Sequence, residues 1–367
     1  MKIAVVHNLP AGGQKRALDE QVKRLSKLHK VDLFTPSDFG YQYPLHFPQS
    51  VISIYFSLPK VYRQIAEKIN RGKYDVVYVN PCFLTQAPFV LRFLKMPSVY
   101  YCPEPKREFY EYIPRKSNFW TYYATLPFRY PIKYIDYENT IHAAKIVTNS
   151  VYSKGLIKRI YGKIAYVNYP GVDTELFRPY LNSVSLSPSI LTVGDISLHK
   201  GHDFIIRSLS LIQKNIRPDL IIVGHGGSEK GYIKRLAASL GVNIKLYEDV
   251  TDKELVDIYN KVRVFVYASH NEPFGMVLLE ALACGLPVVA VDEGGIKEIV
   301  RDSSLGILTK RNLEDFKKAM TRYLKKGQTL KDSRSDPERT ERIKRREYVL
   351  KNWGWEKSVK ELEEYLN

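Results

Sequence analysis

Short apolar runs alternate with longer amphipathic stretches along the first half of the chain. The runs are rich in Val, Ile and Tyr, which favour strands, while stretches such as residues 16–28 repeat apolar positions at helical spacing. Strands alternating with helices are typical of β-α units on a parallel sheet. The predicted strands of this half lie at residues 3–6, 31–34, 75–80, 98–102, 146–150 and 164–168.

The same alternation restarts after a turn-rich stretch at residues 168–173. We therefore expect an α/β protein with two doubly wound domains, an N-terminal one over residues 1–170 and a C-terminal one over residues 171–351. The predicted strands of the second half lie at residues 189–193, 220–223, 243–246, 263–267, 287–291 and 305–308.

Composition indicates a folded protein. Hydrophobic residues make up 44% of the 367 positions and charged residues 26%, which excludes an intrinsically disordered chain. No apolar run reaches the roughly 18 residues that a membrane-spanning helix needs, and the first residues do not resemble a secretory signal. Cys82, Cys102 and Cys284 lack metal-binding spacing, so they indicate packing residues in a reducing compartment. We therefore expect a cytoplasmic protein without a metal site.

The formal net charge of +17 favours an anionic partner. Phosphate groups, nucleic acid and an acidic membrane surface all fit that charge. No recognised nucleic-acid-binding motif accompanies the basic residues, which argues against nucleic acid. Charge alone leaves the other two partners open.

Three glycine-containing loops follow predicted strands, where doubly wound sheets bind ligands. The loop from Gly194 to Lys200 precedes a helix, so backbone amides and the lysine can cradle a phosphate; a surface lysine in an ordinary loop explains it equally well. Gly224 begins a loose match to a dinucleotide-binding fingerprint, which a flexible loop also explains. Gly12 and Gly13 allow a close approach to a ligand or form a plain turn.

Residues 270–290 carry the most specific pattern. A strand-like run ends in a Pro-Phe-Gly turn, and a helix beginning near Gly275 directs its free amides at whatever lies over the loop. Glu272 precedes this turn, and Glu280 lies one to two helical turns beyond the helix start, roughly 7 Å along the axis. An anion site between two carboxylates suits a nucleotide sugar, with Glu272 accepting sugar hydroxyls and Glu280 accepting ribose hydroxyls.

This pattern resembles the retaining glycosyltransferases of family 4, also called group 1. Their hallmark is two glutamates separated by seven residues, with Phe-Gly inside and a Glu-Ala-x-Ala-x-Gly-x-Pro-Val-Val continuation. Further similarities are Gly171-Val172-Asp173 at the hinge, Lys200-Gly201 in the phosphate loop, and Gly294-Gly295 after the hallmark. The sequence matches the hallmark through Glu272, Phe274-Gly275, Glu280-Ala281, Ala283, Gly285 and Pro287-Val288-Val289.

The resemblance implies a GT-B fold, in which two Rossmann-like domains face each other across a cleft. The C-terminal helix, residues 352–367, would cross back to the N-terminal domain. The implied activity is transfer of a sugar from a UDP- or GDP-linked donor to an acceptor hydroxyl, with the anomeric configuration retained and no metal or other cofactor.

The resemblance also implies the residues of the site. The N-terminal domain would bind the acceptor and the C-terminal domain the donor. Implied catalytic residues are Glu272, Lys200 and Glu280, and acceptor-side candidates are Gly12, Gly13, His7 and Glu104. Implied donor contacts are Gly194, Lys200, Gly224, Glu272, Pro273, Phe274, Gly275, Met276, Val277 and Glu280.

Two positions depart from the family pattern. Asp195 stands where the family usually carries an arginine after the first glycine of the phosphate loop. Pro103 stands where the family often has a histidine, and a proline cannot do that histidine's polar work. Glu104 or His7 is a candidate to replace that histidine.

Residues 100–137 are crowded with aromatic and basic side chains, Trp120, Tyr130, Lys133 and Tyr134 among them. Such a mixture suits the interface of an anionic membrane, or it covers the acceptor cleft. We therefore expect a lipid-linked or cell-surface glycan as acceptor and peripheral attachment to the inner face of the membrane. The alternatives are a soluble disaccharide or glucan synthase, and a non-catalytic nucleotide-sugar binding protein.

Overall fold

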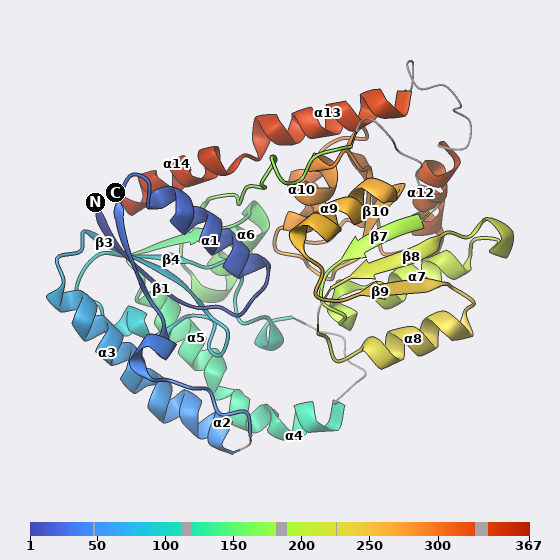
Figure 1. Cartoon of the computed structure of the whole chain (residues 1–367). Coiled ribbons are helices and arrows are strands. Elements are labelled where there is room, and N and C mark those ends of the chain that lie inside the picture. Colours follow the sequence, from blue (N-terminus) through green and yellow to red (C-terminus); the bar gives the residue numbers. More distant parts are fainter. Residues whose placement is uncertain (47, 112–118, 181–188, 225, 327–336) are drawn as a thin grey trace. The chain divides into compact units, whose positions relative to one another are not determined.

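The computed structural model describes residues 1–46, 48–111, 119–180, 189–224, 226–326 and 337–367. It divides into an N-terminal unit of residues 1–111, 120–170 and 355–367, and a C-terminal unit of Gly171–Gly354 (Figure 1). Each unit contains a six-stranded parallel sheet. The predicted α/β class with two doubly wound sheets is therefore confirmed.

The sheet of the N-terminal unit has the strand order β2-β1-β3-β4-β5-β6, and its strands pair in parallel. Its order reverses between β1 and β3, since β2 pairs with the other edge of β1. The strands are β1 (Lys2–Asn8), β2 (Lys30–Phe34), β3 (Val76–Cys82), β4 (Ser98–Tyr101), β5 (Lys145–Thr148) and β6 (Ala165–Val167).

Helices cover both faces of this sheet (Figure 1). The α-helices are α1 (Gly13–Leu25), α2 (Gln49–Ile52), α3 (Leu58–Arg71), α4 (Phe119–Arg129), α5 (Pro131–Ile141), α6 (Val151–Tyr161) and α14 (Trp355–Leu366). A π-helical turn, η2 (Ser53–Ser57), joins α2 to α3, and short 3-10 turns are η1 (Pro36–Phe39), η3 (Phe89–Arg92) and η4 (Arg107–Phe109).

Strand β1 shows why the predicted strands read as continuous apolar runs. Alternate side chains point to opposite faces: Ile3 and Val5 pack with residues of α1 and α14, while Ala4 and Val6 pack with residues of α3. Because both faces are buried, residues 3–6 of this strand are all apolar. Helix α14 contributes Val359, Leu362 and Leu366 to the first of these cores.

The sheet of the C-terminal unit has the order β12-β11-β10-β7-β8-β9, again parallel. The strands are β7 (Ser189–Val193), β8 (Asp219–Val223), β9 (Ile244–Tyr247), β10 (Val264–Tyr267), β11 (Val288–Val291) and β12 (Gly306–Thr309). The helices are η5 (Leu198–Lys200), α7 (His202–Ser210), η6 (Lys214–Ile216), α8 (Lys230–Ser239), α9 (Asp252–Lys261), α10 (Met276–Ala283), α11 (Ile296–Ile299), α12 (Leu313–Lys326) and α13 (Pro337–Asn352).

None of the helices in the described ranges has the length and apolar character needed to cross a bilayer. Residues 112–118 of the aromatic and basic segment lie outside the described residues.

Candidate active site

The strand order of the C-terminal unit brings two predicted site loops together. Strands β7 and β10 are neighbours, and the chain leaves them toward opposite edges of the sheet. Ligands of doubly wound sheets bind at such a reversal, beyond the carboxyl ends of the strands. The loop after β7 carries Lys200, and the loop after β10 carries Glu272.

Lys200 and Glu272 form a largely buried ion pair. Lys200 Nζ lies 3.0 Å from Glu272 Oε2, and the two side chains are 18% and 13% exposed. Tyr267 Oη and Ser269 Oγ donate to the same oxygen, each at 2.8 Å. Within the described part of the chain, Glu272 Oε1 accepts no hydrogen bond. The carboxylate is therefore fixed through one oxygen and keeps the acceptor capacity of the other.

The pair is charged at neutral pH. Burial by itself would raise the pKa of Glu272, but the Lys200 ammonium and the hydrogen bonds from Tyr267 and Ser269 lower it to about 2. Burial would likewise lower the pKa of Lys200, whereas the negative charge of Glu272 raises it well above its usual value. The opposite charges stabilise each other, which is why both ions persist in a buried site.

Two glycines let the surrounding loops reach Glu272 and Lys200. A Cβ on Gly201 would lie 2.0 Å from the carbonyl oxygen of Ala268, and one on Gly294 would lie 2.1 Å from that of Glu272. Both residues also have positive φ angles, of 73° and 76°. These positions require glycine, because a side chain would push the loops apart.

Helix α10 begins directly after the hallmark turn. Gly275 precedes it with φ 97°, and the amides of Met276 and Val277 in the first turn have no intrahelical acceptor. Phe274 is buried with its ring 5.6 Å from that of Trp353, so the turn is packed from beneath. Pro273 is buried as well. A helix start held in this way favours an anion above it.

Glu280, the second hallmark glutamate, lies on α10 and is only 4% exposed. Its Oε2 accepts a hydrogen bond from Tyr259 Oη on α9, at 3.0 Å. Its role toward a ribose stays a prediction.

Arg311 is a residue that the sequence analysis missed. Its guanidinium makes two hydrogen bonds of 2.7 Å to the carboxylate of Glu293. It also donates to the carbonyl oxygens of Ala268 and Ser269, at 3.0 and 3.2 Å. Arg311 therefore ties the segment after β12 to the loops after β10 and β11, and holds the backbone that leads into Glu272. No sequence motif points to Arg311, because this arginine stands alone after a short strand.

The loops after β7 and β8 are also in contact. A Cβ on Gly224 would lie 1.9 Å from the carbonyl oxygen of Gly194, so these two predicted donor residues touch through their backbones. Asp195 is 41% exposed, and its carboxylate lies 3.8 Å from His199 Nε2. Burial opposes its ionisation, but His199 and Lys200 lower its pKa, so Asp195 puts a negative charge beside Lys200.

The predicted acceptor-side residues lie in the N-terminal unit, at the carboxyl ends of its strands. His7 is the last buried residue of β1, which ends at Asn8, while Gly12 and Gly13 lead into α1. Burial, followed by the charge of Lys15, lowers the pKa of His7, which favours neutral imidazole. Gln14 Nε2 donates to Glu104 Oε1 at 3.2 Å, which joins the start of α1 to the loop after β4.

Asp136 on α5 anchors the loop after β4, which carries Glu104, and the segment after β3. Its buried carboxylate accepts hydrogen bonds from the amides of Ala87 and Lys106, both at 3.2 Å, and from Tyr161 Oη at 2.6 Å. Burial raises the pKa of Asp136 to about 6. Gln86 Nε2 further donates to the carbonyl oxygen of Glu104, at 2.8 Å.

Comparison with known proteins relates the C-terminal unit to a known family. Residues 173–342 match the family model described as Glycosyl transferases group 1. This region is therefore similar to the group 1 glycosyltransferases. The D-inositol 3-phosphate glycosyltransferase of Streptosporangium roseum is 30% identical over 183 residues, which cover 44% of this chain and 42% of that protein. The corresponding protein of Streptomyces bingchenggensis is 33% identical over 189 residues, covering 45% and 42%. The chain thus spans about two fifths of the length of these curated relatives.

Solved structures resemble the whole chain. A sucrose-phosphate synthase from Thermosynechococcus elongatus aligns with a TM-score of 0.75 and 19% identity, over 99% of this chain and 98% of that one. Anabaena HepE in complex with UDP and glucose aligns with a TM-score of 0.73 and 17% identity, over 100% and 99%. At such identities the likeness concerns the fold, and it confirms the predicted GT-B class.

The region that matches the family model, residues 173–342, contains every residue of the predicted donor site. The structure brings Lys200 next to Glu272 and Gly194 next to Gly224. Among the described residues, no group of three His, Cys, Asp or Glu side chains could hold a metal ion. The sequence analysis did not foresee Tyr267 and Ser269 as partners of Glu272; both lie within five residues of it, at the end of β10.

Proposed function

We propose that this protein is a retaining glycosyltransferase of family 4 that transfers a hexose from a UDP- or GDP-linked donor to an acceptor hydroxyl. The observation that carries the proposal is the hydrogen bonding of the Glu272 carboxylate. Its Oε2 is saturated by Lys200, Tyr267 and Ser269, while its Oε1 accepts no hydrogen bond from the described residues. A rigid, charged acceptor of this kind suits the hydroxyl groups of a sugar.

Lys200 suits the diphosphate of the donor. An ammonium has three N–H donors, and within the described residues its hydrogen bond goes to Glu272 alone. The remaining donors, together with the first amides of α10, would stabilise the negative charge that grows on the leaving diphosphate. The protein would supply this stabilisation without a metal ion.

In the proposed reaction, the bond between the anomeric carbon and the diphosphate oxygen breaks. A new bond forms from the acceptor oxygen to the same face of that carbon, so the configuration is retained. The acceptor proton passes to an oxygen of the leaving diphosphate. Glu280 would hold the ribose, and the acceptor would bind to the N-terminal domain, residues 1–170, near His7, Gly12, Gly13 and Glu104.

We further propose a lipid-linked or cell-surface glycan as the acceptor, and a cytoplasmic protein bound at the inner membrane face. Aromatic side chains with high exposure support this, with Trp120 at 81% and Tyr134 at 65%. A soluble disaccharide or glucan synthase would not need them.

One observation favours a second candidate, a nucleotide-sugar binding protein without activity. Asp195 carries a negative charge beside Lys200, where the family usually has an arginine. Arg301 is a candidate to replace that arginine. Its guanidinium donates to the carbonyl oxygen of Glu298 at 2.8 Å and lies 5.7 Å from the ring of Trp353. Loss of positive charge at the phosphate loop would weaken leaving-group stabilisation more than binding.

A donor-hydrolysis assay over a panel of UDP- and GDP-sugars tests the proposal. We expect slow release of one nucleoside diphosphate by the wild type, with the loss of that release in Glu272→Gln and Lys200→Gln. Glu314→Gln is the matched control, because Glu314 is an exposed glutamate of the same unit. Binding of a nucleotide sugar without any hydrolysis or transfer would favour the non-catalytic candidate.

A further inference from the structure

Large apolar side chains are exposed together near α2 in the N-terminal unit. Leu45 is 85% exposed, Ile52 51% and Phe56 64%. They lie within twelve positions of one another, on the segment that leads into α2, on α2 itself and on η2. Single exposed apolar residues are ordinary, but several on one short segment, with Ile52 and Phe56 four positions apart, favour an interaction surface.

A second group belongs to the same surface. Tyr130 and Tyr134 at the start of α5 are 57% and 65% exposed. Tyr55 Oη on η2 donates to the carbonyl oxygen of Phe128 at 2.6 Å, only two residues before Tyr130. This hydrogen bond joins η2 to the turn between α4 and α5. We call Leu45, Ile52, Phe56, Tyr130 and Tyr134 the apolar face.

Basic residues predominate around the apolar face, where Glu108 is paired with Arg129 and Glu138 follows Tyr134 by one turn of α5. Residues 39–66 and 119–135, which contribute all five side chains, include no Asp or Glu. Lys60 is exposed one helical turn after Phe56, and the ammonium of Lys133 lies 5.7 Å from the centre of the Tyr130 ring. Aromatic and aliphatic side chains with mostly basic residues among them fit an anionic lipid surface.

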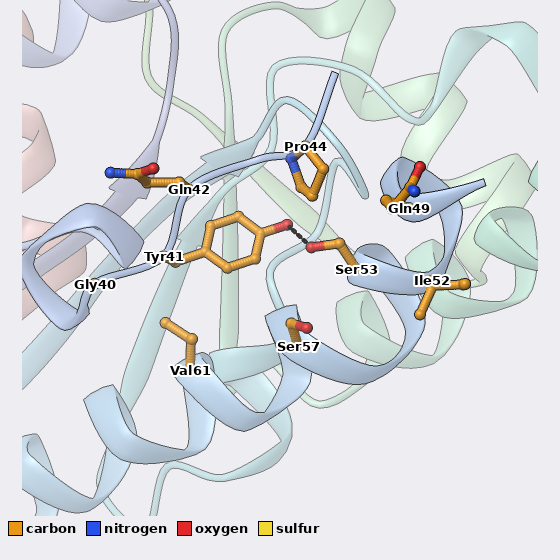
Figure 2. A pocket seen from close by; sticks show the side chains of 9 residues that line it. All are labelled: Gly40, Tyr41, Gln42, Pro44, Gln49, Ile52, Ser53, Ser57 and Val61. Atoms are coloured by element: carbon orange, nitrogen blue, oxygen red, sulfur yellow. Dashed lines mark hydrogen bonds between the residues drawn. The ribbon is translucent and has the colours of Figure 1, made fainter. Parts of the chain in front are cut away.

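A neutral cavity adjoins this face at Ile52. It has a volume of about 430 Å³, and Ile52 belongs both to its lining and to the apolar face. Figure 2 shows Tyr41, Pro44 and Ser53 around it, with the 3.0 Å hydrogen bond between Ser53 and Tyr41. Amides, hydroxyls and apolar groups line it without any charged side chain. The uncharged lining lets this part of the face approach a bilayer without a desolvated charge.

We propose that the apolar face docks on the surface of an anionic bilayer. Leu45, Ile52 and Phe56 enter the interfacial region, the two tyrosines settle at headgroup depth, and Lys60 and Lys133 meet anionic headgroups. This docking assigns a surface to the membrane attachment included in the proposed function, and its use, the presentation of a lipid-linked acceptor, rests on that function.

Vesicle flotation tests the docking. The full-length protein is mixed with phosphatidylcholine vesicles that contain or lack phosphatidylglycerol, at low and high salt. We expect flotation with the anionic vesicles at low salt and release at high salt. Leu45→Ser/Phe56→Ser should lower the partition coefficient at least about tenfold, and Lys60→Gln/Lys133→Gln about fivefold for each cation lost.

Leu28→Ser is the matched control, because Leu28 is 72% exposed in the turn between α1 and β2, and it should float like the wild type. Absence of wild-type flotation, or equal loss in the control, overturns the proposal. The proposal is also overturned if Leu45→Ser/Phe56→Ser binds vesicles like the wild type but loses a self-association that the wild type shows on sedimentation. Donor hydrolysis measured without lipid separates the two proposals, since failed docking leaves it intact and a failed transferase assignment leaves flotation intact.

Discussion

Lys200 Nζ and Glu272 Oε2 lie 3.0 Å apart, although 72 positions separate the two residues in the chain. The pair joins the loops that leave β7 and β10, the neighbouring strands at which the order of the sheet reverses. It therefore combines two tasks, because it holds the two loops together and supplies charges of both signs to one small site.

Removing one member of this pair should destabilise the C-terminal unit. Lys200→Met leaves the Glu272 carboxylate buried without its counter-ion, at a cost of about 3–5 kcal/mol in the free energy of unfolding. The double variant Lys200→Met/Glu272→Gln should lose much less than the sum of the single variants. Urea denaturation of all four proteins measures this, with Lys245→Met at the exposed Lys245–Asp219 pair as control. Additive losses would show that the two residues are not coupled.

Acid should weaken the same unit in a defined window. The pKa of Glu272 is about 2 in the folded protein, against 4.5 for an unperturbed glutamate. The unfolded chain therefore binds the proton first, and this stabilisation is complete above pH 4.5 and lost as the pH falls toward 2. Free energies of unfolding across this range should decline less in Glu272→Gln than in the wild type. Parallel curves for the two proteins would contradict the lowered pKa.

The N-terminal unit should show the opposite dependence through Asp136. Its pKa is about 6 in the folded protein and 3.8 in an unperturbed aspartate, so the folded state holds the proton more tightly. Its contribution is complete below pH 3.8 and is lost as the pH rises through 6. Asp136→Asn should remove this decline, which unfolding followed between pH 4 and 7 can detect. A wild-type curve that rises through the same interval relative to Asp136→Asn would contradict it.

Arg311 should affect catalysis through the position of Glu272. Arg311→Lys loses the paired bonds to Glu293 and at least one of the carbonyl contacts, so we expect kcat to fall about tenfold to a hundredfold with a smaller change in the donor KM. Arg217→Lys is the control, because Arg217 also binds several carbonyl oxygens, but near Ile212 and Gly241. It should lose stability and keep its kcat. An equal fall of kcat in both variants would show that Arg311 stabilises the fold and does not position Glu272.

Gly294→Ala should disturb the site more than an alanine at another left-handed glycine. The new Cβ would meet the carbonyl oxygen of Glu272, and it would also occupy a positive φ. Gly162 has φ 68° and open space around it, so Gly162→Ala costs only the conformational penalty of about 1–2 kcal/mol. Transferase activity at a temperature where both variants remain folded should fall in Gly294→Ala alone. Unchanged activity there would mean that the loop tolerates displacement.

Sequence patterns predicted most of the fold because both sheets are buried on both faces. The apolar runs at β1, β3, β10 and β11 stand out for that reason. The glycines at close loop contacts can likewise be found in the sequence. The segment of α2 and η2 was missed, since α2 is short and preceded by Pro44 and Pro48, and since Ile52 and Phe56 face outward.

The donor site was predicted residue by residue, but its internal contacts were not. Sequence assigned Lys200 to a phosphate and Glu272 to a sugar, and it had no means to show that the two side chains bond to each other. Such a contact depends on strand order, which periodicity does not reveal. Arg311 was missed for the same reason, as its partners follow two other strands.

The most direct test of the account compares binding of a nucleotide sugar and of its free nucleoside diphosphate, by titration calorimetry of the wild type and of Glu272→Gln. If Glu272 Oε1 accepts a sugar hydroxyl, the variant should lose about tenfold to a hundredfold in affinity for the nucleotide sugar and little for the diphosphate. Equal losses for both ligands, or none for either, would contradict the assignment of Glu272 to the sugar.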